Sequence, residues 1–333
     1  ADFFLKNTKD LLLEQKLAYV TGFNSQWQNI GKIENKGIEI ALNTRLIQTK
    51  DFSWDLNFNF SKNSNKVKKL VDDMDMFELE KASWLDVQVA AKVGENYGSI
   101  IGPDFQRNEN GDILIDPSTG LPMYDKSSHI LGNASWDWTG GLVTTLAYKN
   151  LSLSAVFDVK VGADLYSMSA RSAYESGKAL ETLQGREEWY RSEEQRKAAG
   201  FPKGSPDWKP TGGFIAPGVI DNGDGTYRPN DIYINPEDYW MSVCRNAPSM
   251  FIYDNSYVKC RELTLTYQFP KKLLKNVVDN LTISFVARNP FIVYKNIPNI
   301  DPDSNYNNTT GMGLEYGSLP SRKSYGFNVN IKF

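Results

Sequence analysis

Long stretches of this chain alternate between apolar and polar residues, the period expected when a β-strand has one apolar and one polar face. In the stretch 52–61 no charged or amide side chain interrupts the apolar row, which consists of Phe52, Trp54, Leu56, Phe58 and Phe60. Comparable alternation occupies residues 38–46, 140–148, 151–161, 263–269, 281–287 and 325–333. The pattern therefore predicts an all-β protein.

Several of these stretches reach the roughly 9 to 11 residues that a tilted strand needs to cross a bilayer, whereas strands of soluble proteins are usually shorter. The connections at 48–51, 149–150 and 271–280 are short, and those at 62–137, 162–254 and 289–324 are long. Outer-membrane barrels have short turns on one side and long loops on the other. We therefore predict an antiparallel transmembrane β-barrel with short periplasmic turns and three long extracellular loops.

A soluble sandwich or lectin-like domain is the alternative, because its inner faces alternate as well. The polar faces favour the barrel, since they repeatedly carry Asn, Ser, Asp and Arg, which suit a water-filled or plugged lumen. Aromatic residues near strand ends also fit the interfacial girdles of a barrel; they include Trp54, Tyr148, Tyr267 and Tyr325.

Composition and charge further limit the possible kinds of membrane segment and of partner. Hydrophobic residues make up 41% of the chain and aromatic residues 13%, which is enough for a large apolar surface. No run of about 18 apolar residues occurs, so a membrane assignment depends on strands. The net charge of −3 and the absence of a basic stripe exclude nucleic acid as the expected partner. Cys244 and Cys260 can pair or stay free, and two cysteines are too few for a disulfide framework.

The long segments contain other patterns. Residues 166–180 and 185–199 are rich in Ala, Glu, Arg, Gln and Lys and predict two short helices. Residues 203–231 are dense in Gly, Pro, Asn and Asp and predict irregular structure. The sequence starting at Asn108 predicts a turn that leads into 113–115.

Residues for catalysis or metal binding are scarce. His129 is the only histidine and is expected in a loop, so neither a zinc site nor a histidine-based triad has the necessary side chains. The run that starts at Asp221 lacks the spacing and the terminal glutamate of a calcium loop and is read as a turn. Glu187 and Glu188 are adjacent and fit a solvated helix face better than a glycosidase pair. We assign no catalytic residue, metal or cofactor, and no enzyme activity.

Aromatic residues in the long segments are candidates for binding a substrate or a partner protein, although packing within the loops explains them equally well. They are Trp189, Tyr190, Trp208, Tyr239 and Trp240.

Several motifs in order along the chain resemble the SusC/RagA group of TonB-dependent outer-membrane transporters. The first is Asn29-Ile-Gly-Lys-Ile-Glu-Asn-Lys-Gly-Ile-Glu-Ile40, followed by Phe52-Ser-Trp54 and Asn63-Ser-Asn-Lys-Val67. Next come Ile130-Leu-Gly-Asn133, Trp138-Thr-Gly-Gly141 and Tyr148-Lys-Asn150. The last are Arg261-Glu-Leu-Thr-Leu-Thr-Tyr267 with Pro270, Asn299-Ile-Asp-Pro302, and Leu319-Pro-Ser-Arg322 through Phe333. Together these motifs span most of the chain.

The resemblance implies that residues 1–333 are the C-terminal portion of a large plugged barrel, of the roughly 22-stranded kind. It places the plug domain and the TonB box in an N-terminal part outside this sequence, and it implies that Phe333 belongs to the barrel-assembly signal. The chain itself starts abruptly in what looks like the middle of a strand, which suggests a mature or proteolysed fragment.

The implied function is TonB-dependent import of an oligomeric nutrient across the outer membrane of a Gram-negative bacterium, a glycan first and a peptide second. The implied partners are a SusD-like surface lipoprotein, TonB, outer-membrane lipid and the oligosaccharide or peptide substrate. The alternatives are a passive porin or surface-anchoring barrel, and a soluble carbohydrate-binding β-protein.

Overall fold

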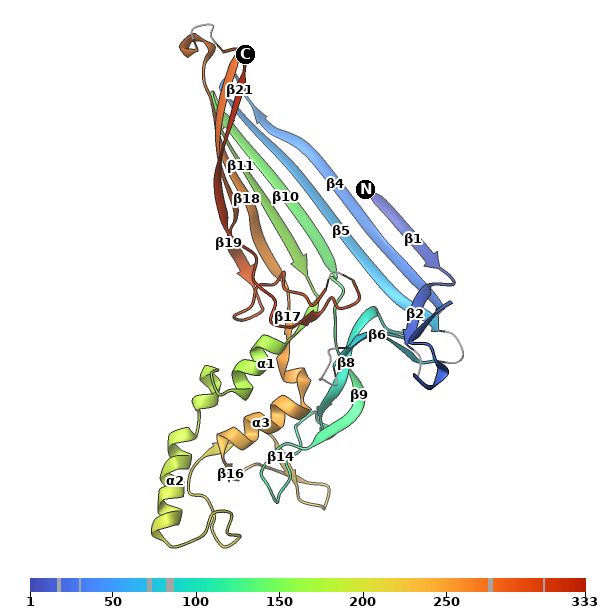
Figure 1. Cartoon of the computed structure of the whole chain (residues 1–333), viewed down its shortest axis with the longest axis vertical. Helices are drawn as coiled ribbons and strands as arrows, with labels where there is room; N and C mark the ends of the chain where they lie inside the picture. Colours follow the sequence, from blue (N-terminus) through green and yellow to red (C-terminus); the bar gives the residue numbers. More distant parts are fainter. Residues whose placement is uncertain (17–18, 30, 71–73, 82–86, 275–277, 308) are drawn as a thin grey trace.

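The chain forms a long sheet that carries a second unit of small sheets and helices at one end (Figure 1). This computed structural model describes residues 1–16, 19–29, 31–70, 74–81, 87–274, 278–307 and 309–333. Parts of the expected turn 271–280 and of the expected loops 62–137 and 289–324 therefore lie outside the described residues, namely 275–277, 71–73, 82–86 and 308.

The long sheet has eight strands, and each strand is antiparallel to its neighbours. In spatial order they are β1 (Asp2–Thr8), β4 (Gly31–Gln48), β5 (Phe52–Leu70), β10 (Trp138–Tyr148), β11 (Leu151–Val161), β18 (Tyr257–Gln268), β19 (Asn280–Lys295) and β21 (Ser324–Lys332). Every alternating stretch of the sequence lies in one of these strands, which confirms the predicted all-β class.

The register of the strands aligns their apolar residues into continuous rows. One row consists of Trp54, Leu146, Leu153, Leu265, Phe285 and Phe327. The row beside it, nearer the turns, consists of Phe52, Tyr148, Leu151, Tyr267, Ile283 and Val329. Leu153 and Leu265 remain 42% and 44% exposed although their strands lie inside the sheet. Large apolar side chains exposed in such rows fit a lipid environment.

Three of the four expected girdle aromatics lie in these two rows near the short turns, namely Trp54, Tyr148 and Tyr267. Tyr325 pairs with Ala287, in the next apolar row towards the long segments.

The opposite face of the sheet is polar. One of its rows consists of Ser53, Ala147, Ser152, Thr266, Ser284 and Asn328. Hydrogen bonds between side chains connect neighbouring strands here, for example from Thr145 to Ser154 at 3.2 Å and between Thr266 and Ser284 at 2.9 Å. The two faces therefore differ in the way that separates a barrel's lipid side from its lumen.

Two strands continue past the positions where loops were expected to begin. β5 extends to Leu70 and not to residue 61, and β19 extends to Lys295, beyond the expected loop start at 289. β4 and β5 contain 18 and 19 residues, and at about 3.3 Å per residue each spans about 60 Å. This length exceeds the thickness of the bilayer, and the alternation visible in the sequence covers only part of each strand.

The described residues of the three long segments form what we call the loop unit: 74–81 and 87–137 in the first, 162–256 in the second, and 296–307 and 309–323 in the third. Its strands are β6 (Met76–Lys81), β7 (Gln88–Lys92), β8 (Tyr97–Phe105), β9 (Tyr124–Asn133), β12 (Asp164–Ser167), β13 (Phe214–Ile215), β14 (Val219–Asp221), β15 (Tyr227–Pro229), β16 (Tyr233–Ile234), β17 (Ile252–Asp254) and β20 (Leu314–Glu315). Its helices are α1 (Met168–Glu175), α2 (Arg186–Ala198) and α3 (Pro236–Asn246), with 3-10 turns η2 (Leu180–Leu183) and η3 (Pro248–Phe251). Outside this unit lie β2 (Leu12–Lys16), β3 (Ser25–Asn29), η1 (Tyr19–Thr21) and η4 (Lys271–Leu273).

The two predicted helices are confirmed as α1 and α2, whereas α3 was not predicted. The predicted turn at Asn108 is also confirmed, since the amide of Asn108 donates to the carbonyl of Asp112 at 3.0 Å. His129 lies in β9 and not in a loop, where it contacts Asp125 at 3.0 Å. The pairing of β9 with β8 places His129 in a strand. The sequence did not predict this strand, because the residues around His129 show no clear alternation.

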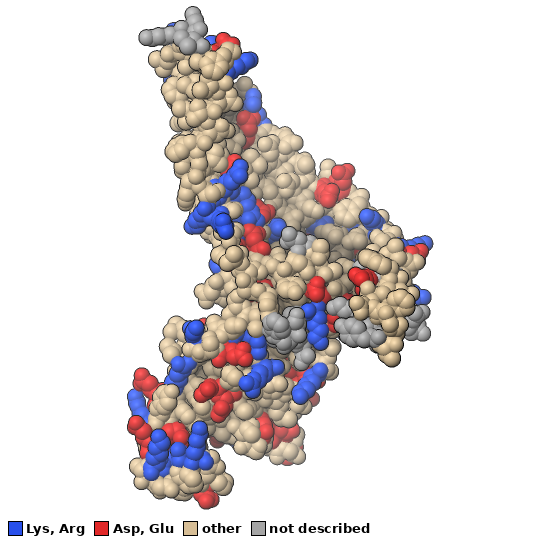
Figure 2. All heavy atoms as spheres, in the orientation of Figure 1, with Lys and Arg blue, Asp and Glu red and all other residues tan. Residues whose placement is uncertain are grey.

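One hydrophobic core joins all three segments of the loop unit. Ile100, Val243 and Leu314 come from the first, second and third segments and are each at most 1% exposed. Figure 2 shows charged side chains gathered over the loop unit and its junction with the sheet, and few over the upper part of the sheet. The long segments therefore fold together as a unit with its own core.

A buried carboxylate ties the third segment to the second. Glu315 is 1% exposed and accepts hydrogen bonds from the Ser167 hydroxyl at 2.8 Å, the Ser169 hydroxyl at 2.7 Å and the Ser169 amide at 3.0 Å. The Ser169 amide belongs to the first turn of α1, where a negative charge is favourable. Removal of Glu315 would leave the buried Ser167 hydroxyl without this acceptor.

An ion cluster ties the third segment to the polar face of the sheet. Lys259 of β18 is 2% exposed and binds both Asp301 and Asp303, the latter at 2.6 Å. Arg261 bridges Asp303 to Asp158 of β11, at 2.5 Å to each carboxylate. Burial by itself raises the pKa of Asp301 and Asp303, but the hydrogen bonds from these cations outweigh burial and hold both pKa values below the ordinary one.

Because one face of the sheet is apolar and the other polar, we expect adjacent positions of β11 to differ in their tolerance of a charged residue. Leu153→Arg places a charge in an apolar row, and we expect it to lower the free energy of unfolding by about 2–4 kcal/mol in lipid. Ser154→Arg is the matched control, because it places the same charge on the polar face and is expected to be tolerated. Urea unfolding of the full-length protein in lipid vesicles measures both. Equal losses would contradict the assignment of faces.

The ion cluster predicts a large effect from removing its buried cation. Lys259→Met leaves Asp301 without its cationic partner, and we expect the free energy of unfolding to fall by about 3–5 kcal/mol at neutral pH. The difference should shrink as the pH falls below about 4, because carboxyl groups with lowered pKa values stabilise the fold only while they are ionised. Denaturant unfolding at several pH values measures this difference.

Arg288→Met is the control for this variant. It removes a solvent-exposed pair with Glu262 at 3.3 Å on the neighbouring strand, and the expected loss is below about 1 kcal/mol. A loss as large as that of Lys259→Met would show that burial does not determine how much these ion pairs contribute to stability.

Candidate functional site

Helix α3 presents one face to the core of the loop unit and the other to solvent. Asn235 caps its first turn, because its side-chain oxygen accepts from the backbone amide of Glu237 at 3.1 Å. Pro236 takes the first helical position, where no amide donor is needed. The buried face includes Tyr239 and Trp240, which are 3% and 8% exposed. Tyr239 and Trp240 are therefore buried, as the alternative of packing within the loops expects.

The physical reason is an aromatic cluster beneath α3. Tyr239 packs against Phe214 with ring centroids 4.5 Å apart, and Trp240 packs against Tyr174 of α1 at 4.7 Å. Aromatic rings lose the most exposed area when they pack together, so the helix turns this face inward. Burial raises the pKa values of Tyr174 and Tyr239 to about 12, and both phenols stay neutral at physiological pH.

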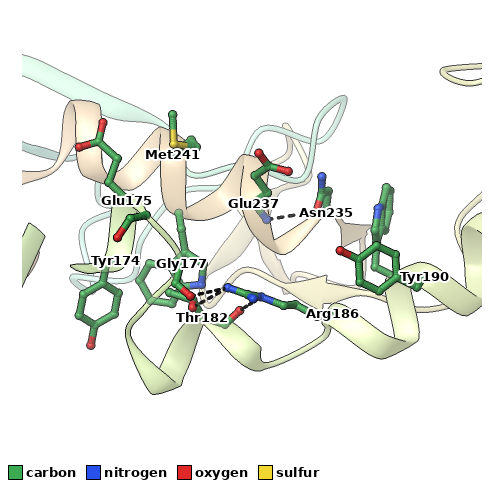
Figure 3. Close-up of a pocket in the computed structure, with 12 residues that line it drawn as sticks. Tyr174, Glu175, Gly177, Thr182, Arg186, Tyr190, Asn235, Glu237 and Met241 are labelled. Carbon is green, nitrogen blue, oxygen red and sulfur yellow. Dashed lines mark hydrogen bonds between the residues drawn. The ribbon is translucent and has the colours of Figure 1, made fainter. Parts of the chain in front are cut away.

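Helix α2 begins immediately after Gly185, which adopts a left-handed conformation with φ 79° that favours glycine. Arg186 then turns back towards the preceding segment. Its guanidinium donates to the carbonyl of Thr182 at 2.8 Å and to the carbonyl of Gly177 at 2.9 Å (Figure 3). No carboxylate within the described ranges forms an ion pair with Arg186. The arginine therefore holds the 177–182 segment in place.

Between α1, α2 and α3 lies a cavity of about 220 Å³, which we call the aromatic cavity (Figure 3). Its lining combines aromatic rings, two carboxylates and one guanidinium: Tyr174, Glu175, Arg186, Trp189, Tyr190, Glu237 and Trp240, with Ser176, Gly177, Thr182, Asn235 and Met241. A more open hollow of about 630 Å³ adjoins it and shares Trp189, Asn235 and Met241. The two spaces together form a polar and aromatic surface on both sides of α3.

The structure brings together three of the five predicted aromatics. Trp189, Tyr190 and Trp240 line the aromatic cavity. Tyr239 faces the core, and Trp208 lies apart, packed on Phe201 at 5.6 Å. The indole nitrogens of Trp240 and Trp208 are buried and have no hydrogen-bond acceptor within the described part of the chain.

Sequence reasoning missed several lining residues, notably Tyr174, Arg186 and Glu237. Glu237 had a usable signal, because Asn235 and Pro236 before it mark a helix start. Tyr174 and Arg186 had none, because their role depends on contacts with a helix more than 40 residues further along the chain.

The lining suits binding by stacking and hydrogen bonding. The described residues contain no group of three His, Cys, Asp or Glu side chains that could hold a metal ion. The predicted turn at Asp221 is confirmed as the hairpin between β14 and β15. Glu187 and Glu188 are exposed on α2, as expected of a solvated helix face. Cys244 and Cys260 are both buried and free, and burial raises the pKa of the Cys244 thiol to about 12.

None of the helices that the structure describes combines the length and apolar character needed to cross a membrane.

Comparison with known proteins identifies the relationship. No family model matches the chain. The TonB-dependent receptor P3 of Formosa agariphila is 26% identical, and the match covers 100% of this chain and 32% of that protein. The TonB-dependent receptor SusC of Bacteroides thetaiotaomicron is 24% identical, over 100% of this chain and 30% of that protein. These matches confirm the resemblance of the chain to the SusC/RagA group of TonB-dependent receptors.

Solved structures agree on the fold. The RagAB peptide importer in its closed-closed state has a TM-score of 0.66 and 19% identity, covering 99% of this chain and 33% of that one. Its open-open state has a TM-score of 0.62 and 20% identity, with 99% and 32% covered. The chain spans about a third of the length of the relatives it matches. It is part of an outer-membrane β-barrel, and its grouping with receptors agrees with the expectation that it is not an enzyme.

The aromatic cavity predicts different effects of removing two of its rings. Trp240→Ala opens a space in the core of the loop unit, and we expect the free energy of unfolding to fall by about 3–5 kcal/mol. Tyr190 is 67% exposed, and Tyr190→Ala is expected to change it by no more than about 0.5 kcal/mol. Denaturant unfolding, monitored by protease cleavage within α2, measures the free energy of unfolding of both variants. A large loss at Tyr190 would mean that its ring is structural and not available to a ligand.

Proposed function

We propose that the whole protein, of which this chain is the C-terminal portion, imports an oligomeric nutrient across the outer membrane with energy from TonB. The observation that carries the proposal is a sheet with an apolar and a polar face in a chain that matches TonB-dependent receptors along its full length. The apolar rows lie in lipid, and the polar rows face the lumen around a plug supplied by the rest of the protein.

The loop unit lies on the extracellular side in this proposal. All three long segments leave the same end of the sheet, opposite the short turns and the C-terminus (Figure 1). The aromatic cavity then faces the medium from which the nutrient comes. Phe333 directly follows β21, at the end of the sheet that this proposal places in the periplasm, and its proposed role is in barrel assembly.

A glycan is the first candidate substrate, and the partner is a SusD-like surface lipoprotein over the loop unit. The relative named SusC supports the partner, and exposed aromatic rings such as Tyr190, on which a sugar ring can stack, support the glycan. A peptide is the second candidate, because the solved structures similar to this chain are of a peptide importer.

The test uses the full-length receptor in its own host. A strain that lacks the receptor is supplied with the wild-type gene or with a gene lacking the TonB-binding segment, and growth is followed on neutral oligosaccharides and on oligopeptides as sole carbon source. We expect wild type, and not the TonB-binding variant, to restore growth on at least one oligosaccharide.

Two other growth results would each support a different function. Growth restored only on peptides would support the second candidate. Equal growth with both genes would indicate a passive pore, and would contradict energised import.

A further inference from the structure

The apolar face of the sheet ends, on the side of the loop unit, in a group of lysines on β4 and β5. The apolar row of β5 stops at Phe60, and the next positions on the same face are Lys62, Ser64 and Lys66. Lys36 of β4 pairs directly with Ser64. It therefore lies on this face as well, diagonal to both lysines of β5. We call Lys36, Lys62 and Lys66 the lysine cluster.

The three ammonium groups are near one another and unpaired. Diagonal neighbours on one face of an antiparallel pair lie about 7–8 Å apart, a distance that long lysine side chains can close. None of the three side chains forms a hydrogen bond or an ion pair with a described residue. Glu34 is opposite Lys66 in the register but binds Lys68 at 2.8 Å. Because like charges this close repel each other, a bound anion would stabilise the cluster.

Apolar side chains lie directly beside these lysines. Lys62 pairs with Trp138 of β10, whose ring packs on that of Phe60 with centroids 5.6 Å apart. Lys36 pairs with Leu5 of β1, which is 65% exposed. A ligand at this place meets cations and apolar surface together. The chemistry that fits both is an anionic group joined to an apolar chain.

The height of the cluster corresponds to the edge of a bilayer. From Phe52 to Lys62 the strand rises about 33 Å at about 3.3 Å per residue. At the roughly 40° tilt of barrel strands this is about 25 Å of height, which equals the height of a barrel's apolar band. Lys62 and Lys36 therefore lie at the level of lipid headgroups, and Lys66 lies further out. In the orientation proposed above, these headgroups belong to the leaflet that faces the medium.

From these features we infer that the lysine cluster binds the phosphate groups of an anionic lipid in the leaflet that faces the medium. A phosphate can accept hydrogen bonds from several ammonium groups at once, while the acyl chains lie against Trp138 and Leu5. Clusters of lysines beside a membrane are attracted to anionic lipid, and each lysine adds to the attraction. The inference rests on the membrane placement in the proposed function and is independent of the imported nutrient.

The experiment adds lipid A with two phosphate groups to the purified full-length receptor in detergent, and native mass spectrometry measures the lipid bound at increasing concentrations. Dephosphorylated lipid A has the same acyl chains without the anion, and inorganic phosphate, added as a competitor, has the anion without the chains. We expect dephosphorylated lipid A to bind about tenfold or more weakly than lipid A, and phosphate to leave lipid A bound. We expect the combined variant Lys36→Gln, Lys62→Gln and Lys66→Gln to weaken binding of lipid A about tenfold or more.

The combined variant Lys50→Gln, Lys271→Gln and Lys272→Gln is the matched control. These lysines are also exposed, and the change in net charge is the same, but they lie at the short turns at the other end of the sheet. Binding of lipid A is expected to stay unchanged. Lys62→Gln alone is a second test variant, expected to weaken binding about threefold, and it keeps the inference testable if the combined variant does not fold.

Four results would overturn the inference. Equal binding of lipid A by wild type and the cluster variants would exclude this site, and an equal loss in the control variant would mean that net charge alone attracts the lipid. Equal binding of dephosphorylated lipid A would exclude a phosphate contact. Displacement of lipid A by inorganic phosphate at the same concentration would mean that the ligand is the free anion. Each result leaves energised import standing, because the growth test measures nutrient uptake and not lipid binding.

Discussion

Backbone pairing between antiparallel strands is the interaction on which the rest of this structure depends. A bilayer offers no partner for amide and carbonyl groups, so a spanning segment must satisfy them within the sheet. Because directly paired residues share a face, the same pairing lines up Trp54, Leu153 and Phe327 in one apolar row, although they are far apart in the sequence. A slip of one residue in any strand would put polar side chains into lipid.

The loop unit depends on contacts of another kind. Its core takes side chains from three segments. Buried Glu315 connects the third segment to the second, and buried Lys259 of β18 connects the third segment to the sheet by binding Asp301 and Asp303. Buried charges are costly unless they are paired, so each group requires one arrangement of the segments around it. The ordered position of the third segment over the sheet follows from these pairs.

In the proposed import process the aromatic cavity, between α1, α2 and α3, lies in the part of the loop unit that is far from the sheet (Figure 1). A nutrient would contact this cavity before it reaches the lumen. The cavity requires no bond-making chemistry, and its rings and hydrogen-bonding groups suit transient binding.

The sequence by itself determined the strands, because alternation is a local property that each strand carries in full, as in 151–161. It also determined α1 and α2 by composition, and contained the capping signal of α3 at Asn235 and Pro236. Only the tertiary structure decided that Trp240 is buried and that His129 lies in a strand. These outcomes depend on contacts between segments distant in sequence, and such contacts produce no periodic pattern in the amino-acid sequence.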